Sequence, residues 1–137
     1  MKKNFNFKIK VYYEDTDAGG VVYYANYLKF LERARSEAIA DIRLSNQKIK
    51  KDFGLLIIVK SCNVDFKKSA FLEDILKIKS SIISFSKTSL SMNQIIFRKD
   101  DIIVNAKVHL VFINEKGKPS RIPEKIITKL KPYLSHD

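Results

Sequence analysis

The residues best suited to chemistry lie together in the segment 13–27. An acidic run at 14–17 is followed by Gly19 and Gly20, and an apolar helical spacing begins at Asn26. Glycines let a backbone approach a ligand closely. The N-terminus of a helix presents unpaired N–H groups and a partial positive charge. The segment therefore predicts a carboxylate beside donors aimed at an anion. These are two parts of acyl-transfer hydrolysis, a nucleophile or general base and an oxyanion hole.

The same segment has a plainer interpretation. A strand-to-helix junction commonly carries an Asx turn and acidic N-capping residues, and residue types alone do not separate this from a catalytic carboxylate. Under both interpretations Asp15 is predicted to be a turn or cap residue. Asn26 is predicted either to cap the helix or to orient the loop that carries Asp17.

Hydrophobic periodicity predicts the elements around this segment. Residues 7–13 alternate apolar and polar side chains, which is typical of a half-buried strand. From Asn26 the spacing predicts an amphipathic helix of about four to five turns. Its predicted apolar stripe consists of Leu28, Leu31, Ala34 or Arg35, Ala38, Ile39 and Ile42. Residues 45–54 are predicted to hold a further helical turn that closes at Gly54.

The second half of the chain is predicted to be mostly strand. Four long runs are rich in Ile, Val, Phe, Ser and Thr, at residues 55–66, 74–86, 88–98 and 102–113. Residues 99–101 form a tight hairpin link, and a last helix starts at Pro123 and ends or kinks at Pro132.

This order of elements predicts an α+β fold, because a single amphipathic helix and a curved antiparallel sheet can only bury their apolar faces against each other. The expected arrangement is the hotdog fold, a curved antiparallel β-sheet wrapped around a central α-helix. With 137 residues and 45% hydrophobic side chains, the chain is expected to form a single domain over residues 1–137.

Cysteine, histidine and hydropathy counts exclude several classes. The single cysteine, Cys62, excludes a disulfide framework, and His109 and His136 lie too far from it for a zinc site. Cys62 is expected to be a buried inert thiol and His109 a structural histidine. The longest apolar run, 55–59, is far shorter than the roughly 20 residues of a membrane span. A charged N-terminus without an apolar core predicts no secretory signal, so a cytoplasmic location is expected.

The formal net charge of +11 and the sequence pI of about 9.7 raise the alternative of a module that binds nucleic acid or an anionic lipid surface. The basic residues are mainly lysine and are interleaved with acids everywhere except in 116–131. That distribution favours a diffuse solvated charge over a nucleic-acid reader, which would concentrate arginine. A basic surface would also suit an acidic partner such as acyl carrier protein.

The run from Tyr13 to Leu28, Tyr-Glu-Asp-Thr-Asp-Ala-Gly-Gly-Val-Val-Tyr-Tyr-Ala-Asn-Tyr-Leu, resembles the signature of the 4-hydroxybenzoyl-CoA thioesterase family. Within the family it is most similar to the YbgC-like, Tol-Pal-associated bacterial acyl-CoA thioesterases. Supporting matches are the Glu-Arg-Ala-Arg run at 32–35, the segment 65–74 and the closing run 117–123. The resemblance implies an acyl-CoA thioesterase with a hotdog fold, assembled as a dimer or a homotetramer with active sites at subunit interfaces.

The resemblance also implies roles for individual residues. Asp17 falls on the catalytic aspartate, which attacks the thioester carbonyl or activates water, and the amide of Tyr24 falls on the oxyanion hole. Gly19 and Gly20 would keep the approach open, and no metal or redox cofactor is implied. Relatives in the YbgC-like subgroup commonly have histidine where this chain has Tyr24. Without that histidine no side-chain proton relay is expected here, whereas the role of the backbone amide does not depend on the side chain.

Substrate contacts are expected from a few further residues. Lys87 falls where family members place a basic contact to coenzyme A, although a solvated turn lysine is an equal alternative; Arg98, Lys99 and Arg121 are weaker candidates. The aromatic residues Tyr23, Tyr24 and Tyr27 are expected either to line the acyl pocket or a subunit contact, with plain aromatic packing as an equal alternative.

Overall fold

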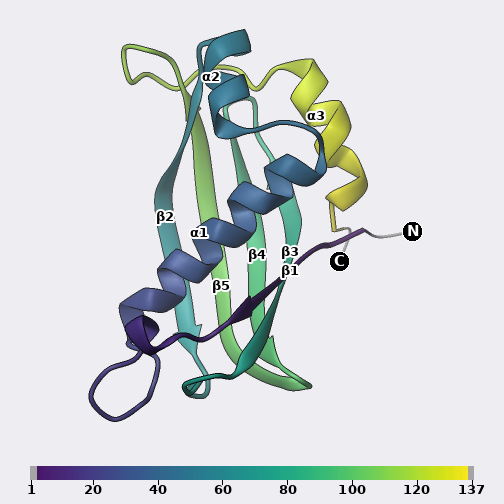
Figure 1. Ribbon diagram of the computed structural model, residues 1–137. Coiled ribbons are helices and arrows are strands. Elements are labelled where there is room, and N and C mark those ends of the chain that lie inside the picture. The colour runs from purple at the N-terminus through teal and green to yellow at the C-terminus, as the bar shows by residue number, and fades with distance from the viewer. Residues whose placement is uncertain (1–2, 136–137) are drawn as a thin grey trace.

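Five antiparallel strands form one curved sheet with the order β1-β3-β4-β5-β2 (Figure 1). The structure is a computed structural model and describes residues 3–135. The strands are β1 (Phe5–Lys10), β2 (Leu56–Phe66), β3 (Ile75–Phe85), β4 (Ser89–Arg98) and β5 (Asp101–Ile113). Strands β1 and β2 are the two edges. The four predicted long strands are confirmed, and the tight link is a two-residue turn, because Arg98 pairs with Asp101.

Helix α1 (Tyr24–Asp41) crosses the concave face of the sheet (Figure 1). The predicted hotdog arrangement is therefore confirmed. Its buried residues are Tyr27, Phe30, Leu31, Ala34 and Ala38. The predicted stripe was wrong at Leu28, which is 47% exposed, because the neighbouring Tyr27 fills that part of the helix–sheet interface.

The first strand was predicted three residues too late at its end. Strand β1 pairs with β3 only as far as Lys10 and Ile75, where β3 begins. Residues 13–15 instead form a short 3-10 turn that leads away from the sheet edge. The change of direction brings the acidic run to the N-terminal end of α1.

Two short helices complete the fold. Helix α2 (Asn46–Phe53) ends at Gly54, as the sequence predicts; the Ser45 side chain caps its start, and Gly54 has the left-handed conformation. Helix α3 (Glu124–Leu130) follows Pro123, and the chain then forms a 3-10 turn that contains Pro132.

A buried glutamine fixes α1 on the sheet. Gln94 of β4 is fully buried, and its side-chain amide donates to the Leu31 carbonyl (3.1 Å) and to Ser80 Oγ (3.0 Å). Its Oε1 accepts from Arg35 Nη1 at 3.0 Å. Because buried polar groups are costly when unpaired, this network specifies where along the sheet α1 lies.

Candidate active site

Asp17 lies at the start of a tight turn on the surface. The Gly20 amide donates to the Asp17 carbonyl (3.0 Å), and the Gly19 amide donates to Asp17 Oδ1 (2.9 Å). The predicted Asx turn is therefore present. Gly20 has φ +77, a conformation that L side chains rarely adopt. The second carboxylate oxygen, Oδ2, has no hydrogen-bond partner among residues 3–135, and Asp17 is exposed.

The N-terminus of α1 is open. Tyr24 is the first helical residue, and no side chain caps the helix, so the expected acidic N-cap of this helix is wrong. In the described part of the chain, the amides of Tyr24 and Ala25 have no hydrogen-bond acceptor. Free N–H groups at the positive end of an 18-residue helix are suited to stabilise an oxyanion.

Asp15 joins the Asp17 turn to the helix. Its side chain is almost completely buried, with 5% exposure of the residue, and Oδ2 accepts from the Tyr12 amide at 2.9 Å. Oδ1 accepts from the Asn26 side-chain amide at 3.0 Å, and the Asp15 carbonyl accepts from the Tyr23 amide. Asp15 is thus a turn residue whose side chain caps the 3-10 turn at Tyr12 and not α1, and Asn26 orients the loop rather than capping the helix.

A second segment holds the far side of this turn in place. We call residues 16–22 the Asp17 turn and residues 67–74 the β2–β3 loop. The Val22 amide donates to the Ala70 carbonyl (2.9 Å), the Leu72 amide donates to the Gly20 carbonyl (3.1 Å), and Val21 forms a β-bridge with Phe71. The backbone of the β2–β3 loop therefore holds the Asp17 turn in its conformation.

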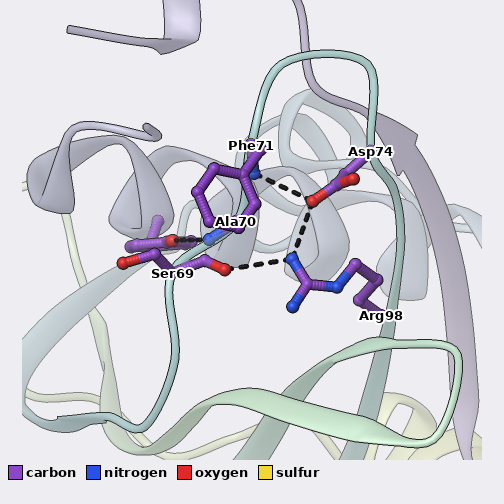
Figure 2. A network of polar contacts seen from close by, with 6 residues as sticks. Ser69, Ala70, Phe71, Asp74 and Arg98 are labelled. Atoms are coloured by element: carbon purple, nitrogen blue, oxygen red, sulfur yellow. Dashed lines mark hydrogen bonds and ion pairs between the residues drawn. The ribbon is translucent and has the colours of Figure 1, made fainter. Parts of the chain in front are cut away.

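The β2–β3 loop is itself tied to the helix and to the sheet (Figure 2). The Ala70 amide donates to the Tyr27 hydroxyl at 3.0 Å. Asp74 Oδ2 accepts from the Phe71 amide (2.8 Å) and from Arg98 Nη1 (2.8 Å). Sequence reasoning missed these contacts; the only signal was the similarity of residues 65–74 to the family.

Aromatic side chains surround the open helix end. Tyr23 and Tyr24 are 48% and 62% exposed, whereas Tyr27 is buried. The Tyr24 ring meets the Phe66 ring edge-on, with 6.2 Å between centroids. A cavity of about 200 Å³ opens here between Tyr24, Phe66 and the start of the β2–β3 loop. Tyr27 is thus a packing residue, whereas Tyr23 and Tyr24 remain accessible to a substrate or a subunit.

Two of these hydroxyls have shifted pKa values. A hydrogen bond with the Tyr24 side chain raises the pKa of the exposed Tyr23 hydroxyl. Burial raises the pKa of Tyr27, and this effect outweighs the Ala70 amide that favours the ionised form. Both side chains therefore stay neutral near pH 7 and act only through hydrogen bonds and packing.

The predicted basic contacts divide into two groups. Arg98 is paired with Asp74 and is not free to contact a phosphate, so it is removed from the candidates. Lys87 and Arg121 line one groove at the link between β3 and β4. That link is separated from the β2–β3 loop by the 11 residues of β3, or roughly 30 Å. Within one chain, the β3–β4 link, which contains Lys87, and the segment that leads into α1, which contains Asp17, lie at opposite ends of the sheet (Figure 1).

A mainly apolar cavity lies apart from the Asp17 turn. Its volume is about 450 Å³, and it lies between the second half of α1, helix α2 and the sheet. Ile57 and Val59 of β2 contribute to its wall, and Glu32, Arg35 and Ser36 are its polar lining on α1. Burial lowers the pKa of Arg35, although the guanidinium remains charged at neutral pH.

The other singled-out residues have no contact with Asp17. Cys62 is exposed on β2, so the expectation of a buried thiol was wrong. Partial burial of its sulfur raises its pKa, which keeps the thiol protonated. His109 Nδ1 is hydrogen-bonded to Ser91 Oγ at 3.0 Å, which agrees with a structural role, whereas His136 lies outside the described residues. Over residues 3–135, no group of His, Cys, Asp or Glu is arranged to hold a metal ion, and no helix is long and apolar enough to cross a membrane.

Comparison with known proteins connects this geometry to a family. The model of the thioesterase-like superfamily matches residues 11–130. The chain is 37% identical over 129 residues to the acyl-CoA thioester hydrolase YbgC of Escherichia coli, covering 93% of this chain and 96% of the relative. It is 32% identical over 127 residues to the acyl-CoA thioesterase YbgC of Haemophilus influenzae, covering 92% and 93%.

Solved structures agree. A probable thioesterase from Bartonella henselae superposes with a TM-score of 0.85 at 35% identity, covering 88% of this chain and all of that one. A 1,4-dihydroxy-2-naphthoyl-CoA thioesterase from Synechocystis superposes with a TM-score of 0.86 at 23% identity, covering 94% and 96%. The second likeness establishes the shared fold alone.

Proposed function

The chain belongs to the thioesterase-like superfamily, and from this premise we propose that it hydrolyses acyl-CoA thioesters to the free acid and coenzyme A. One observation carries the proposal: an exposed carboxylate, Asp17, lies in a hydrogen-bonded turn of the segment that leads into the uncapped N-terminus of α1. The similarity to YbgC thioesterases over nearly the whole chain supports acyl-CoA as the substrate class.

In the proposed mechanism the thioester carbonyl oxygen accepts from the free amide of Tyr24. Asp17 Oδ2 then has two possible roles. As a nucleophile it attacks the carbonyl carbon, and the C–S bond breaks to release coenzyme A as a thiolate; water then hydrolyses the resulting anhydride, which restores the Asp17 carboxylate, forms the acid and supplies the proton that the thiolate takes up. As a general base it takes a proton from an attacking water and passes it to the departing thiolate. The Asx-turn hydrogen bond holds Oδ1, so Oδ2 is the reacting oxygen in both.

The side chain of Tyr24 is a phenol and offers neither an imidazole nor a carboxylate as a proton relay. Proton transfer therefore falls to Asp17 and water, and the backbone amide alone provides the oxyanion contact. The exposed rings of Tyr23 and Tyr24 are proposed to flank the thioester, while Gly19 leaves the approach to Asp17 free of a side chain. This chemistry uses no metal and no redox cofactor.

We propose that a second copy of the chain completes the site. Strand β2 is an edge with exposed apolar residues, Leu56, Ile58, Val59 and Phe66, which favours pairing with another strand. Two β2 strands that pair antiparallel about an axis near Ser61 would set Phe66 of one copy opposite Leu56 of the other. The partner's Lys87 end would then meet the Asp17 end and supply the cationic contact to coenzyme A.

The same arrangement offers room for an acyl chain. The 450 Å³ apolar cavity opens beside Ile57 and Val59, at the end of the sheet that carries Lys87. A cavity of this size is within the range of small-molecule sites. In a two-fold dimer its position would bring it toward the partner's Asp17 turn, so the acyl tail is proposed to extend into it.

The test is a panel of short-chain, medium-chain and aromatic acyl-CoA substrates, with thiol release as the readout. Wild type, Asp17→Asn and the matched control Glu14→Gln are compared; Glu14 is an exposed acid in the same run. We expect Asp17→Asn to lower kcat by about a hundredfold or more while the control remains like wild type. Wild-type turnover by Asp17→Asn would disprove the role of Asp17, and no turnover of any thioester by wild type would disprove the function. Acyl carrier protein thioesters in the same panel, at low and high salt, test an acidic carrier as the donor.

A further inference from the structure

Arg98, at the end of β4, has no part in the proposed chemical steps, yet it is the centre of a network of polar contacts (Figure 2). Nη1 donates to Asp74 Oδ2 at 2.8 Å and to the Ser69 carbonyl at 3.0 Å. The guanidinium also lies over the Phe71 ring, with 5.5 Å to the centroid. One side chain of the sheet thus contacts the start, the middle and the end of the β2–β3 loop.

Asp74 connects Arg98 to the backbone of the β2–β3 loop. The oxygen that pairs with Arg98 also accepts from the Phe71 amide at 2.8 Å, and the Asp74 amide donates back to the Phe71 carbonyl at 3.0 Å. This tight turn requires Glu73 at φ +69, a conformation that is costly for a non-glycine residue. The ion pair and the carboxylate–amide bond together oppose that strain.

The part of the β2–β3 loop around Phe71 that is held in this way also pairs with the Asp17 turn. Phe71 forms the β-bridge with Val21, while the residues on either side of it make the two backbone hydrogen bonds to Gly20 and Val22. Val21 in turn accepts from the Asp17 amide at 2.9 Å. A short path of hydrogen bonds therefore leads from the sheet to the backbone of Asp17.

We propose that Arg98, acting through Asp74, is a positioning residue that sets the distance between the Asp17 carboxylate and the amide of Tyr24. The inference rests on the proposed function, because it assumes that these two groups act on one thioester. A displacement of about 1 Å in a reacting group can cost a hundredfold in rate, so a loose β2–β3 loop should lower kcat more than it weakens binding.

The chain contains a matched control for this ion pair. Lys68 of the same loop pairs with Asp101 of the same β4–β5 hairpin at 3.1 Å. The side chains of that pair are 55% and 53% exposed, against 23% for both Arg98 and Asp74. Neither partner of the exposed pair holds the Phe71 turn. Asp101→Asn therefore removes a loop-to-hairpin ion pair without touching the proposed path.

The experiment compares kcat, KM and thermal unfolding for Arg98→Met, Arg98→Lys, Asp74→Asn and Asp101→Asn, on an acyl-CoA that wild type hydrolyses. We expect kcat to fall about tenfold or more in Arg98→Met and Asp74→Asn, with KM changed by less than about twofold. Arg98→Lys should keep part of kcat, since one ammonium can still pair with Asp74. Asp101→Asn should match wild type. Full kcat in folded Arg98→Met would overturn the proposal.

If Arg98→Met does not fold, amide hydrogen exchange on Arg98→Lys tests the proposal instead. In Arg98→Lys, peptides covering residues 17–24 and 69–74 should exchange faster than in wild type, while the β4–β5 core should not change. Unchanged exchange there, or faster exchange with full kcat, would overturn the proposal. The Asp17→Asn variant in the same series separates the two hypotheses: if it is inactive while Arg98→Met is fully active, only the positioning role fails.

Discussion

The Asn26 side-chain amide donates a 3.0 Å hydrogen bond to Oδ1 of Asp15. This contact joins the first turn of α1, which carries the free amide of Tyr24, to the turn that precedes Asp17. It links residues 11 positions apart and ends on a carboxylate that is almost fully buried. Two sets of contacts therefore fix the position of Asp17 relative to the Tyr24 amide. One is the bond between Asn26 and Asp15, and the other is made by the β2–β3 loop.

The first prediction concerns that bond. Asn26→Ala leaves one oxygen of buried Asp15 without its donor, which should lower the free energy of unfolding by about 1–3 kcal/mol. Because the Asp17 turn is then less tightly joined to the helix, kcat should fall as well. Urea unfolding and steady-state kinetics measure the two effects. Asn6→Ala is the control, since the Asn6 amide makes only an exposed 3.4 Å contact with the Asn4 carbonyl; equal behaviour of the two variants would contradict the prediction.

The second prediction separates the two glycines. A Cβ at Gly20 would meet nothing within 4 Å, but the residue has φ +77, so Gly20→Ala should destabilise the fold by about 1–2 kcal/mol through backbone strain alone. A Cβ at Gly19 would meet Asp17 Oδ1 at an ordinary 3.5 Å, so Gly19→Ala should leave stability unchanged. If Gly19 keeps the approach to Asp17 open, its variant should lose kcat/KM despite normal stability. Thermal unfolding and kinetics on both variants decide this, and unimpaired kcat/KM in Gly19→Ala would argue against the open approach.

Much of the fold could be predicted because it depends on local pattern. The helical spacing after Asn26 and the four long Ile- and Val-rich runs determine one helix and one sheet, and their order leaves few ways to bury both faces. The predictions were wrong where packing or pairing with other residues determines the burial of a side chain or the end of a strand. Leu28 is exposed because Tyr27 fills its place, and the first strand ends early because β3 begins at Ile75.

The site was only partly predictable for the same reason. The Asx turn at Asp17 and the cap role of Asp15 follow from residues within a few positions of each other. The bonds from Ala70 and Leu72 to the Asp17 turn join segments about fifty positions apart, and nothing in the spacing indicates them. From its charge alone, Arg98 is a candidate for phosphate binding. Its partner in the structure is Asp74, and that pair depends on how two loops pack together at one end of the sheet.

The third prediction tests whether the site is shared between subunits. Asp17→Asn and Lys87→Glu subunits carrying different tags are co-expressed, and the mixed dimer is purified. If Lys87 acts on the partner's Asp17, the mixed dimer has one site with both native residues and one site with neither. It should then show about half of the wild-type kcat and the wild-type KM, whereas the Lys87→Glu homodimer should have a several-fold higher KM, as expected for loss of an exposed ionic contact.

A mixed dimer that keeps the raised KM of Lys87→Glu would mean that Lys87 acts within its own chain, and a wild-type KM in the Lys87→Glu homodimer would mean that Lys87 does not contact the substrate. Light scattering on wild type provides the control, because the experiment requires at least a dimer. A variant at Leu56 or Ile58, two exposed apolar residues of the β2 edge, should weaken assembly if β2 forms the interface. Both measurements are independent of which acyl group is preferred.

The fourth prediction follows from the buried Tyr27. Burial raises its pKa in the folded state, so above about pH 10, near the ordinary pKa of tyrosine, the unfolded chain loses this proton while the folded protein keeps it. The unfolded state then binds fewer protons than the native state, and Tyr27 lowers the free energy of unfolding as pH rises. Tyr27→Phe removes this dependence, but it also leaves the Ala70 amide without its 3.0 Å acceptor.

Tyr27→Phe should therefore be less stable than wild type at pH 7, by about 1–3 kcal/mol, and the difference should shrink as pH rises above about 10. Urea unfolding at several pH values measures the gap. Lysine titration also affects the alkaline limb of both proteins, but it cancels in the comparison. Tyr13→Phe is the control, because Tyr13 is 81% exposed and its variant should follow wild type throughout. A gap between wild type and Tyr27→Phe that stays constant from pH 7 into the alkaline range would mean that the Tyr27 hydroxyl ionises as easily in the folded protein as in the unfolded chain.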